Sequence, residues 1–316
     1  MKNNISINFI LHERYSYFIN NIKEFAKLTK NSKDKLLINL LVSFESQNLK
    51  EAIDILNYNE IRANIFKING NNNYMYKIYT ALENSEKYSI SIDEDVFLSS
   101  NVWEYFINNI SVLEDDENLF LSPTLTTGIP SVDLFAKNFL NNEENDKLEN
   151  IYLKTYIPNT NGADYDILKE NTINAKKWNI EAFYKNVNKI NHYYKGVHPI
   201  RFSYEAQKFL NDICISNIKK IINCKDFSLL KIKRPYFCNN VFGIKTDTWK
   251  YILKDDSLIR DCFDEVPLNL YMQQNNLNMV FIDKGVAFHP SFNTINSLGY
   301  NYSDLSDEFF NNEYFK

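Results

Sequence analysis

Apolar strand-like segments and amphipathic helices alternate through the first hundred residues, and this alternation limits the possible folds more than any other feature. Residues 5–11 and 36–42 are nearly continuous apolar runs, which is typical of parallel strands that helices cover on both faces. Residues 18–26 and 49–56 place apolar side chains at helical spacing. A third strand at 63–68, a third helix at 75–82 and a fourth strand at 88–92 complete the series.

This order predicts an α/β fold with a Rossmann-like, mostly parallel central sheet flanked by helices. Ligands of such sheets bind beyond the carboxyl ends of the strands. Residues from about 133 to 227 are rich in Asn, Glu and Lys and predict a helical insertion, and strand-like runs return at 228–232, 241–244 and 279–282. Because we find no internal repeat and no Pro- or Ser-rich linker, we expect a single domain over residues 1–316.

Composition excludes several classes of function. The net charge of −5 is unlike that of a general nucleic-acid binder, which carries a basic excess. The four cysteines include no C-x-x-C pair, so neither a zinc ribbon nor a redox motif is indicated. The N-terminus lacks the apolar region and cleavage site of a signal peptide, and no apolar stretch is long enough to span a bilayer. We therefore expect a cytoplasmic protein.

The fourth predicted strand ends in the acidic triplet Asp93-Glu94-Asp95. Two carboxylates that flank one residue at a strand end can both face a hard cation. Mn²⁺ and Mg²⁺ prefer such oxygen ligands, and substrate phosphate and water complete their coordination. A cation held there would neutralise a diphosphate as it leaves. Acidic triplets also occur on solvated loops, but the position after a buried strand favours a functional site.

The segment from Tyr88 to Leu98, YSISIDEDVFL, resembles the DxD strand and turn of GT-A nucleotide-sugar glycosyltransferases of the family-2 type. The resemblance implies that Asp93 and Asp95 bind the metal, with Asp93 also near the ribose of a UDP- or GDP-linked sugar. It makes residues 1–100 the nucleotide-sugar-binding half and residues 101–316 the acceptor-binding half. It also places His12, Glu45 and Lys77 as donor-binding candidates; however, Lys77 lies opposite the apolar stripe of its helix.

Two downstream groups extend the resemblance. Asp264 and Glu265 open a predicted helix, where GT-A enzymes hold the carboxylate that deprotonates the acceptor hydroxyl; as a structural alternative, Asp264 caps the helix. Either acid could be the base. His289, in the sequence GVAFHP, resembles the downstream metal ligand of several GT-A families. Neutral imidazole can complete a manganese site beside carboxylates.

The expected function is therefore metal-dependent transfer of a sugar to a glycan or lipid-linked acceptor, with inversion favoured by the acid pair. Synthesis of a bacterial surface polysaccharide or lipooligosaccharide is what the resemblance implies, with peripheral contact at the inner face of the membrane. Two alternatives stay open: a GT-A-like module that binds glycans or partners without catalysis, and a sugar nucleotidylyltransferase. The second would need a Gly-rich loop after the first strand, where this chain has His12-Glu13-Arg14.

Overall fold

The computed structural model describes most of the chain. The described residues are 5–11, 18–29, 36–42, 47–67, 74–155, 178–187, 198–238, 240–259, 265–290 and 303–311. The helices among them are α1 (Phe18–Thr29), α2 (Gln47–Tyr58), α3 (Tyr74–Glu83), α4 (Ser100–Asn109), α5 (Ser131–Phe139), α6 (Asn142–Lys154), α8 (Ile180–Val187), α9 (Tyr204–Ile222), α10 (Thr246–Lys254), α11 (Asp256–Ile259), α12 (Val266–Gln274) and α13 (Ser303–Phe310).

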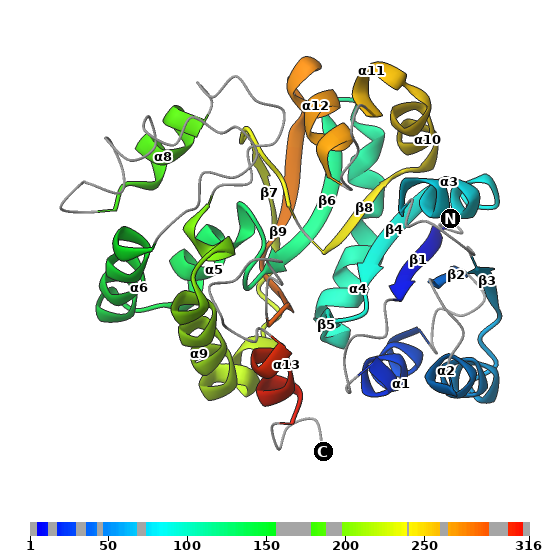
Figure 1. Cartoon of the computed structure of the whole chain (residues 1–316), viewed down its shortest axis with the longest axis horizontal. Coiled ribbons are helices and arrows are strands. Elements are labelled where there is room, and N and C mark those ends of the chain that lie inside the picture. The colour runs from blue at the N-terminus through cyan, green and yellow to red at the C-terminus, as the bar shows by residue number, and fades with distance from the viewer. Residues whose placement is uncertain are drawn as a thin grey trace.

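A nine-stranded sheet forms the centre of the molecule (Figure 1). Its strands are β1 (Ile5–Leu11), β2 (Leu36–Val42), β3 (Ala63–Lys67), β4 (Tyr88–Asp93), β5 (Phe97–Leu98), β6 (Asn118–Leu125), β7 (Ser228–Ile232), β8 (Val241–Lys245) and β9 (Asn278–Phe288). The order is β3-β2-β1-β4-β8-β6-β9-β5, and β7 pairs with β9. The strands β3, β2, β1, β4, β6 and β9 run in one direction, and β5, β7 and β8 run in the other. The predicted mostly parallel sheet flanked by helices is confirmed.

Helices cover both faces of the sheet, as the apolar runs require. One face packs against α1, α2 and α4, whose buried side chains include Phe25, Leu56 and Phe106. The opposite face packs against α3, α10 and α12, with Trp249 at its centre. A row of amides fixes the register of the first three strands, because Asn39 donates to Asn8 over 2.8 Å and Asn64 donates to Asn39 over 3.1 Å.

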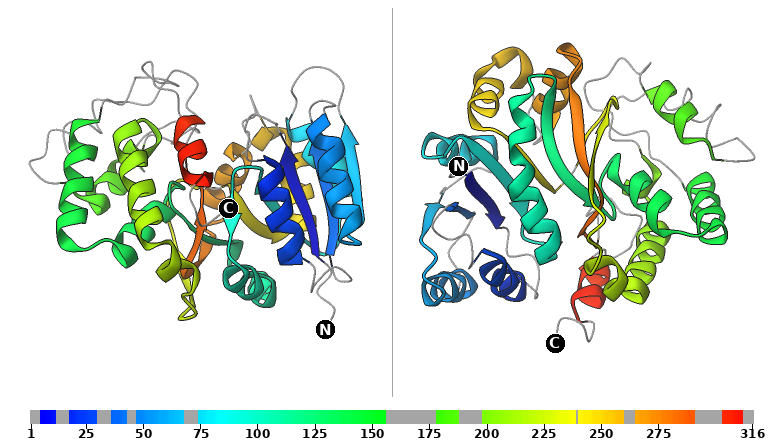
Figure 2. Two further views of the ribbon diagram at one scale, coloured as in Figure 1. Left: turned by 90° about the horizontal axis from the view of Figure 1, so that it is seen from below. Right: turned by 180° about the vertical axis from the view of Figure 1, so that it is seen from behind.

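A second group of helices lies beside the sheet. The helices α5, α6, α8, α9 and α13 share a hydrophobic core with the carboxyl end of β9. Figure 2 shows α6 and α9 on the opposite side of the molecule from α1 and α2. Between positions 133 and 227, the described residues are helices and their connections, as the sequence predicts. Within the described part of the chain, no helix is long and apolar enough to cross a membrane.

Candidate metal and sugar-transfer site

The acidic triplet lies at the carboxyl end of β4, in the turn that leads to β5. Asp93 is the last residue of the strand, and its amide donates to the carbonyl oxygen of Asn240 over 3.0 Å. On the other side, the Asn21 side chain of α1 donates to the carbonyl oxygen of Glu94. Glu94 and Asp95 are 2% and 7% exposed. The turn is therefore held from both sides and is not a solvated acidic loop.

Asp95 faces His289 across the sheet. The Nε2 atom of His289 lies 3.4 Å from Oδ2 of Asp95, and the histidine is 2% exposed. The strand pairing explains the meeting, because Phe97 in β5 lies opposite Phe288 at the end of β9. Each residue of the pair thus lies one or two positions beyond the paired segment. Two ligands at about 2.1 Å from one cation, at right angles, lie roughly 3 Å apart, so this separation fits a shared ion.

Two threonines hold His289 from behind. The Thr127 hydroxyl lies 2.6 Å from Nδ1 of the ring and donates to the His289 carbonyl oxygen over 2.9 Å. Thr126 bonds the backbone of the same residue, accepting from its amide over 3.1 Å and donating to its carbonyl oxygen over 3.0 Å. The ring is consequently oriented with Nδ1 toward the protein and Nε2 toward Asp95. A partner on the second ring nitrogen is the usual support of a metal-binding histidine.

Asp93 is held by a different neighbour. The Asn240 side-chain amide donates to its Oδ2 over 2.6 Å. Desolvation, followed by repulsion from the Asp95 carboxylate, raises the pKa of Asp93 to about 7, while the Asn240 bond and the proximity of His289 oppose the rise. In addition, the Oδ1 atom of Asn240 is buried and has no hydrogen-bond partner among the described residues. An incoming donor group or cation would satisfy this atom.

The donor set fits a divalent cation that shares its coordination with substrate. Within the described residues, no three His, Cys, Asp or Glu side chains are grouped closely enough to hold a metal by themselves. The pair of Asp95 and His289 offers one oxygen and one nitrogen, and Asp93 lies close enough to Asp95 for their charges to repel. Mg²⁺ sites of this kind use one or two carboxylates and take their other ligands from substrate phosphates and water.

Glu265 stands at the start of α12, in a cluster with Tyr236 and Arg201. Tyr236 donates its hydroxyl proton to Oε1 of Glu265, and the Arg201 guanidinium lies 3.6 Å from the same oxygen. The helix begins at Val266 with Glu265 in the cap position, and the Glu265 side chain makes no capping bond. The cap residue is therefore Glu265 and not Asp264. Its carboxylate is turned toward the tyrosine and the arginine instead of capping the helix.

Tyr236 and Asn240, which contact the Glu265 cluster and Asp93 respectively, are four positions apart in the sequence. Between them, Cys238 forms an antiparallel bridge with Ile129, which follows the threonines that hold His289. Tyr236, Cys238 and Asn240 thus contact Glu265, Ile129 and Asp93 in turn.

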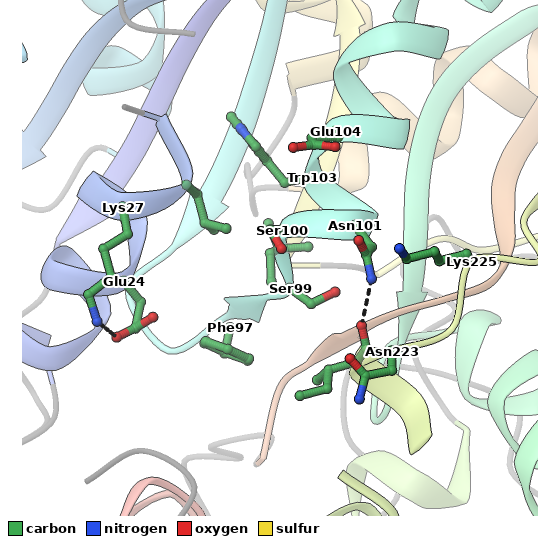
Figure 3. A pocket seen from close by; sticks show the side chains of 13 residues that line it. Glu24, Lys27, Phe97, Ser99, Ser100, Asn101, Trp103, Glu104, Asn223 and Lys225 are labelled. Carbon is green, nitrogen blue, oxygen red and sulfur yellow. Dashed lines mark hydrogen bonds and ion pairs between the residues drawn. The ribbon is translucent and has the colours of Figure 1, made fainter. Parts of the chain in front are cut away.

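A cavity of about 420 Å³ opens beside the triplet (Figure 3). Glu24 and Lys27 of α1 lie on one side and Asn223 and Lys225 on the other, with Phe97 between them. None of the predicted metal ligands lines this cavity. Its polar walls are already paired in part, because Lys27 bonds Glu24 over 2.5 Å and Asn101 bonds the Ile222 carbonyl oxygen over 3.0 Å. The geometry of the acidic turn, and not this cavity, defines the candidate site.

The structure therefore brings together three of the predicted site residues, Asp93, Asp95 and His289, at the acidic turn. It places Glu265 against Tyr236 and Arg201. His12, Glu45 and Asp264 lie outside the described residues. Lys77 belongs to α3, but its side chain is outside the description. The predicted site residues do not include the neighbours that hold these groups, which are Arg201, Tyr236, Asn240, Thr126 and Thr127.

No protein-family model matches the chain, and no curated protein matches its sequence. Solved structures are similar in part. A mannosyltransferase from Pyrobaculum calidifontis, in complex with GDP-Man and Mn²⁺, is 10% identical over 41% of this chain and 37% of its own, with a TM-score of 0.34. GalNAc-T7 with UDP, GalNAc and Mn²⁺ is 10% identical over 97% of this chain and 50% of its own, with a TM-score of 0.47.

Glucosyl-3-phosphoglycerate synthase from Mycobacterium tuberculosis, with phosphoglyceric acid, is 13% identical over 43% of this chain and 50% of its own, with a TM-score of 0.31. The chain therefore matches half or less of the length of each of these proteins. Similarity at this level assigns neither a family nor a reaction to the chain.

Proposed function

We propose that the chain is a metal-dependent glycosyltransferase that moves a sugar from a nucleoside-diphosphate sugar to a hydroxyl of a glycan or lipid-linked acceptor. The observation that carries the proposal is the buried pairing of Asp95 with His289 at adjoining strand ends, 3.4 Å apart. A buried carboxylate and imidazole offer one oxygen and one nitrogen ligand, and a diphosphate and water would complete the coordination of a cation held between them.

The residues at the acidic turn would bind the metal and the donor. Asp95 and His289, with Asp93 beside them, hold the metal and the diphosphate end of the donor. Asn240 orients Asp93, and its buried Oδ1 atom, which has no partner among the described residues, would accept a hydrogen bond from the donor. When bound, Mn²⁺ or Mg²⁺ supplies a Lewis acid that neutralises the diphosphate as it leaves.

Glu265 is the candidate base for an inverting transfer. It would take the proton of the acceptor hydroxyl while that oxygen bonds to the anomeric carbon and the bond to the diphosphate breaks. Tyr236 and Arg201 hold its Oε1 atom. Asp264 stays a second candidate for this role. We further propose an acceptor from bacterial surface polysaccharide or lipooligosaccharide synthesis, following the sequence resemblance.

A ligand screen followed by an assay tests the function. Nucleotide sugars with UDP and GDP are titrated into the protein with and without Mn²⁺, and the melting temperature is followed, because a ligand that binds the native state stabilises it. We expect stabilisation by one nucleotide class that requires Mn²⁺, and metal-dependent release of the nucleoside diphosphate. Binding without any turnover or hydrolysis would favour the non-catalytic module. Absence of binding to every nucleotide with Mn²⁺ present would refute the proposal.

A further inference from the structure

The Thr127 hydroxyl contacts two atoms of the same histidine. It lies 2.6 Å from the ring Nδ1 of His289 and 2.9 Å from the carbonyl oxygen of His289, and Thr127 is fully buried. A hydroxyl has one proton and two lone pairs, so it can donate to only one of these atoms at a time. The carbonyl oxygen keeps a second donor in either case, because the Thr126 hydroxyl lies 3.0 Å away.

Two arrangements of protons are therefore available, and each gives the Nδ1 atom a partner. In the first, Thr127 donates to Nδ1, and the ring proton is on Nε2, which faces Oδ2 of Asp95 at 3.4 Å. In the second, Thr127 donates to the carbonyl oxygen and accepts from Nδ1–H. In this arrangement Nε2 presents a lone pair toward Asp95. Only the second arrangement offers a ligand to a cation, because a protonated nitrogen cannot coordinate a metal.

We propose that Thr127 is a positioning residue whose hydroxyl turns to let His289 exchange tautomers when a divalent cation binds beside Asp95. Nε2 releases a proton to water, Nδ1 takes one up, and the imidazole stays neutral throughout. The hydroxyl donates to the ring before the exchange and accepts from it afterwards, so no buried ring nitrogen loses its partner. The inference rests on the proposed metal-dependent function and names the residue that makes the histidine available.

The substitution Thr127→Val removes the hydroxyl and keeps the shape. In the metal-bound arrangement it leaves a buried Nδ1–H without an acceptor, which penalises that arrangement. Loss of such a support typically costs about 10- to 100-fold in metal affinity. Thr127→Ser keeps the hydroxyl. The folding control is Thr124→Val, because Thr124 is also fully buried and donates to the Ile282 carbonyl oxygen instead of to His289.

The test is a calorimetric titration of Mn²⁺ in the presence of UDP and, separately, of GDP. We expect affinity about 10-fold or more weaker for Thr127→Val, and near wild type for Thr127→Ser and Thr124→Val. Equal affinity of Thr127→Val and wild type overturns the role of Thr127 and leaves the proposed function standing. Failure of the wild type to bind Mn²⁺ with either nucleotide overturns the proposed function and this inference with it.

A spectroscopic measurement on the wild type keeps the inference testable if Thr127→Val does not fold. The ¹⁵N shifts of the imidazole distinguish the two tautomers, and His289→Gln identifies the signals among the four histidines of the chain. Zn²⁺ serves as the diamagnetic probe. We expect the proton on Nε2 without metal and on Nδ1 with it. A proton that stays on Nδ1 in both states would show that no exchange takes place and would overturn the inference.

Discussion

The Asn240 side-chain amide donates to Oδ2 of Asp93 over 2.6 Å, although the two residues are 147 positions apart. This bond lowers the pKa of Asp93 against the larger effect of desolvation. Removing it by Asn240→Ala should raise that pKa further, so the carboxylate ionises at higher pH. We expect the pH midpoint of Mn²⁺ binding to move upward in a titration series. A midpoint equal to that of the wild type would show that the bond does not tune Asp93.

Asp93 itself should destabilise the metal-free protein at neutral pH and above. Its pKa is about 7 in the folded chain and 3.8 as a free group, so between these values the unfolded chain releases a proton that the folded chain retains. Its contribution to stability therefore falls as pH rises through that window. Asp93→Asn should unfold at higher urea than the wild type at about pH 8, and the gap should close below about pH 4. A gap independent of pH would contradict this account.

Asp95→Ala should abolish metal-dependent donor binding. The substitution removes the oxygen that faces His289 and leaves a lone imidazole. Calorimetry with UDP or GDP and Mn²⁺ measures the loss. The control is Asp116→Ala. This carboxylate is exposed and forms an ion pair with Lys245 over 2.8 Å, and it does not belong to the acidic turn. Unchanged nucleotide affinity in Asp95→Ala would remove this residue from the metal site.

Glu265→Gln should separate transfer from binding. The amide cannot accept the acceptor's proton, so we expect transfer to fall by about 100-fold or more while donor affinity is retained. Tyr236→Phe is the matched variant, because it removes the hydroxyl that bonds Glu265 and leaves the carboxylate in place. Its loss of activity should be smaller. Normal turnover in Glu265→Gln would move the role of base to Asp264.

Gly243→Ala should destabilise the sheet core. A Cβ atom at this position would lie 2.6 Å from Cδ1 of Ile110 and 3.2 Å from the Phe106 ring. Overpacking of this kind costs about 1–3 kcal/mol in the free energy of unfolding. Ile110→Val removes the clashing Cδ1 atom, so the double variant should recover part of the loss. Additive losses in urea unfolding would show that the two sites do not couple.

The first four strands and three helices were predictable because their signals are local. Continuous apolar runs and helical spacing appear within 5 to 12 residues, which is the length of the observed elements. The prediction was less complete where backbone irregularity breaks the pattern. The last strand was predicted at 279–282, but β9 extends to Phe288 through a register shift around Lys284, whose φ is 60°.

The candidate site likewise contains residues that the sequence predicts and supporting contacts that it does not. The acidic turn was predictable because it follows a buried strand, and His289 because its sequence resembles a known ligand position. The supporting contacts were not predictable. Thr127 meets His289 and Asn240 meets Asp93 over 162 and 147 positions, and neither residue type stands out in a chain rich in Asn. Such pairs follow from the order of strands in the sheet, which no local pattern reveals.

The place of β8 between β4 and β6 affects how the chain must be made. A ribosome releases β4 and β6 long before Val241–Lys245 emerges to fill the gap between them. Until then, two apolar strand edges are open to any other extended chain. Translation that stops in the stretch between β6 and β8 would yield fragments prone to aggregate, so slow synthesis there should increase the demand on chaperones.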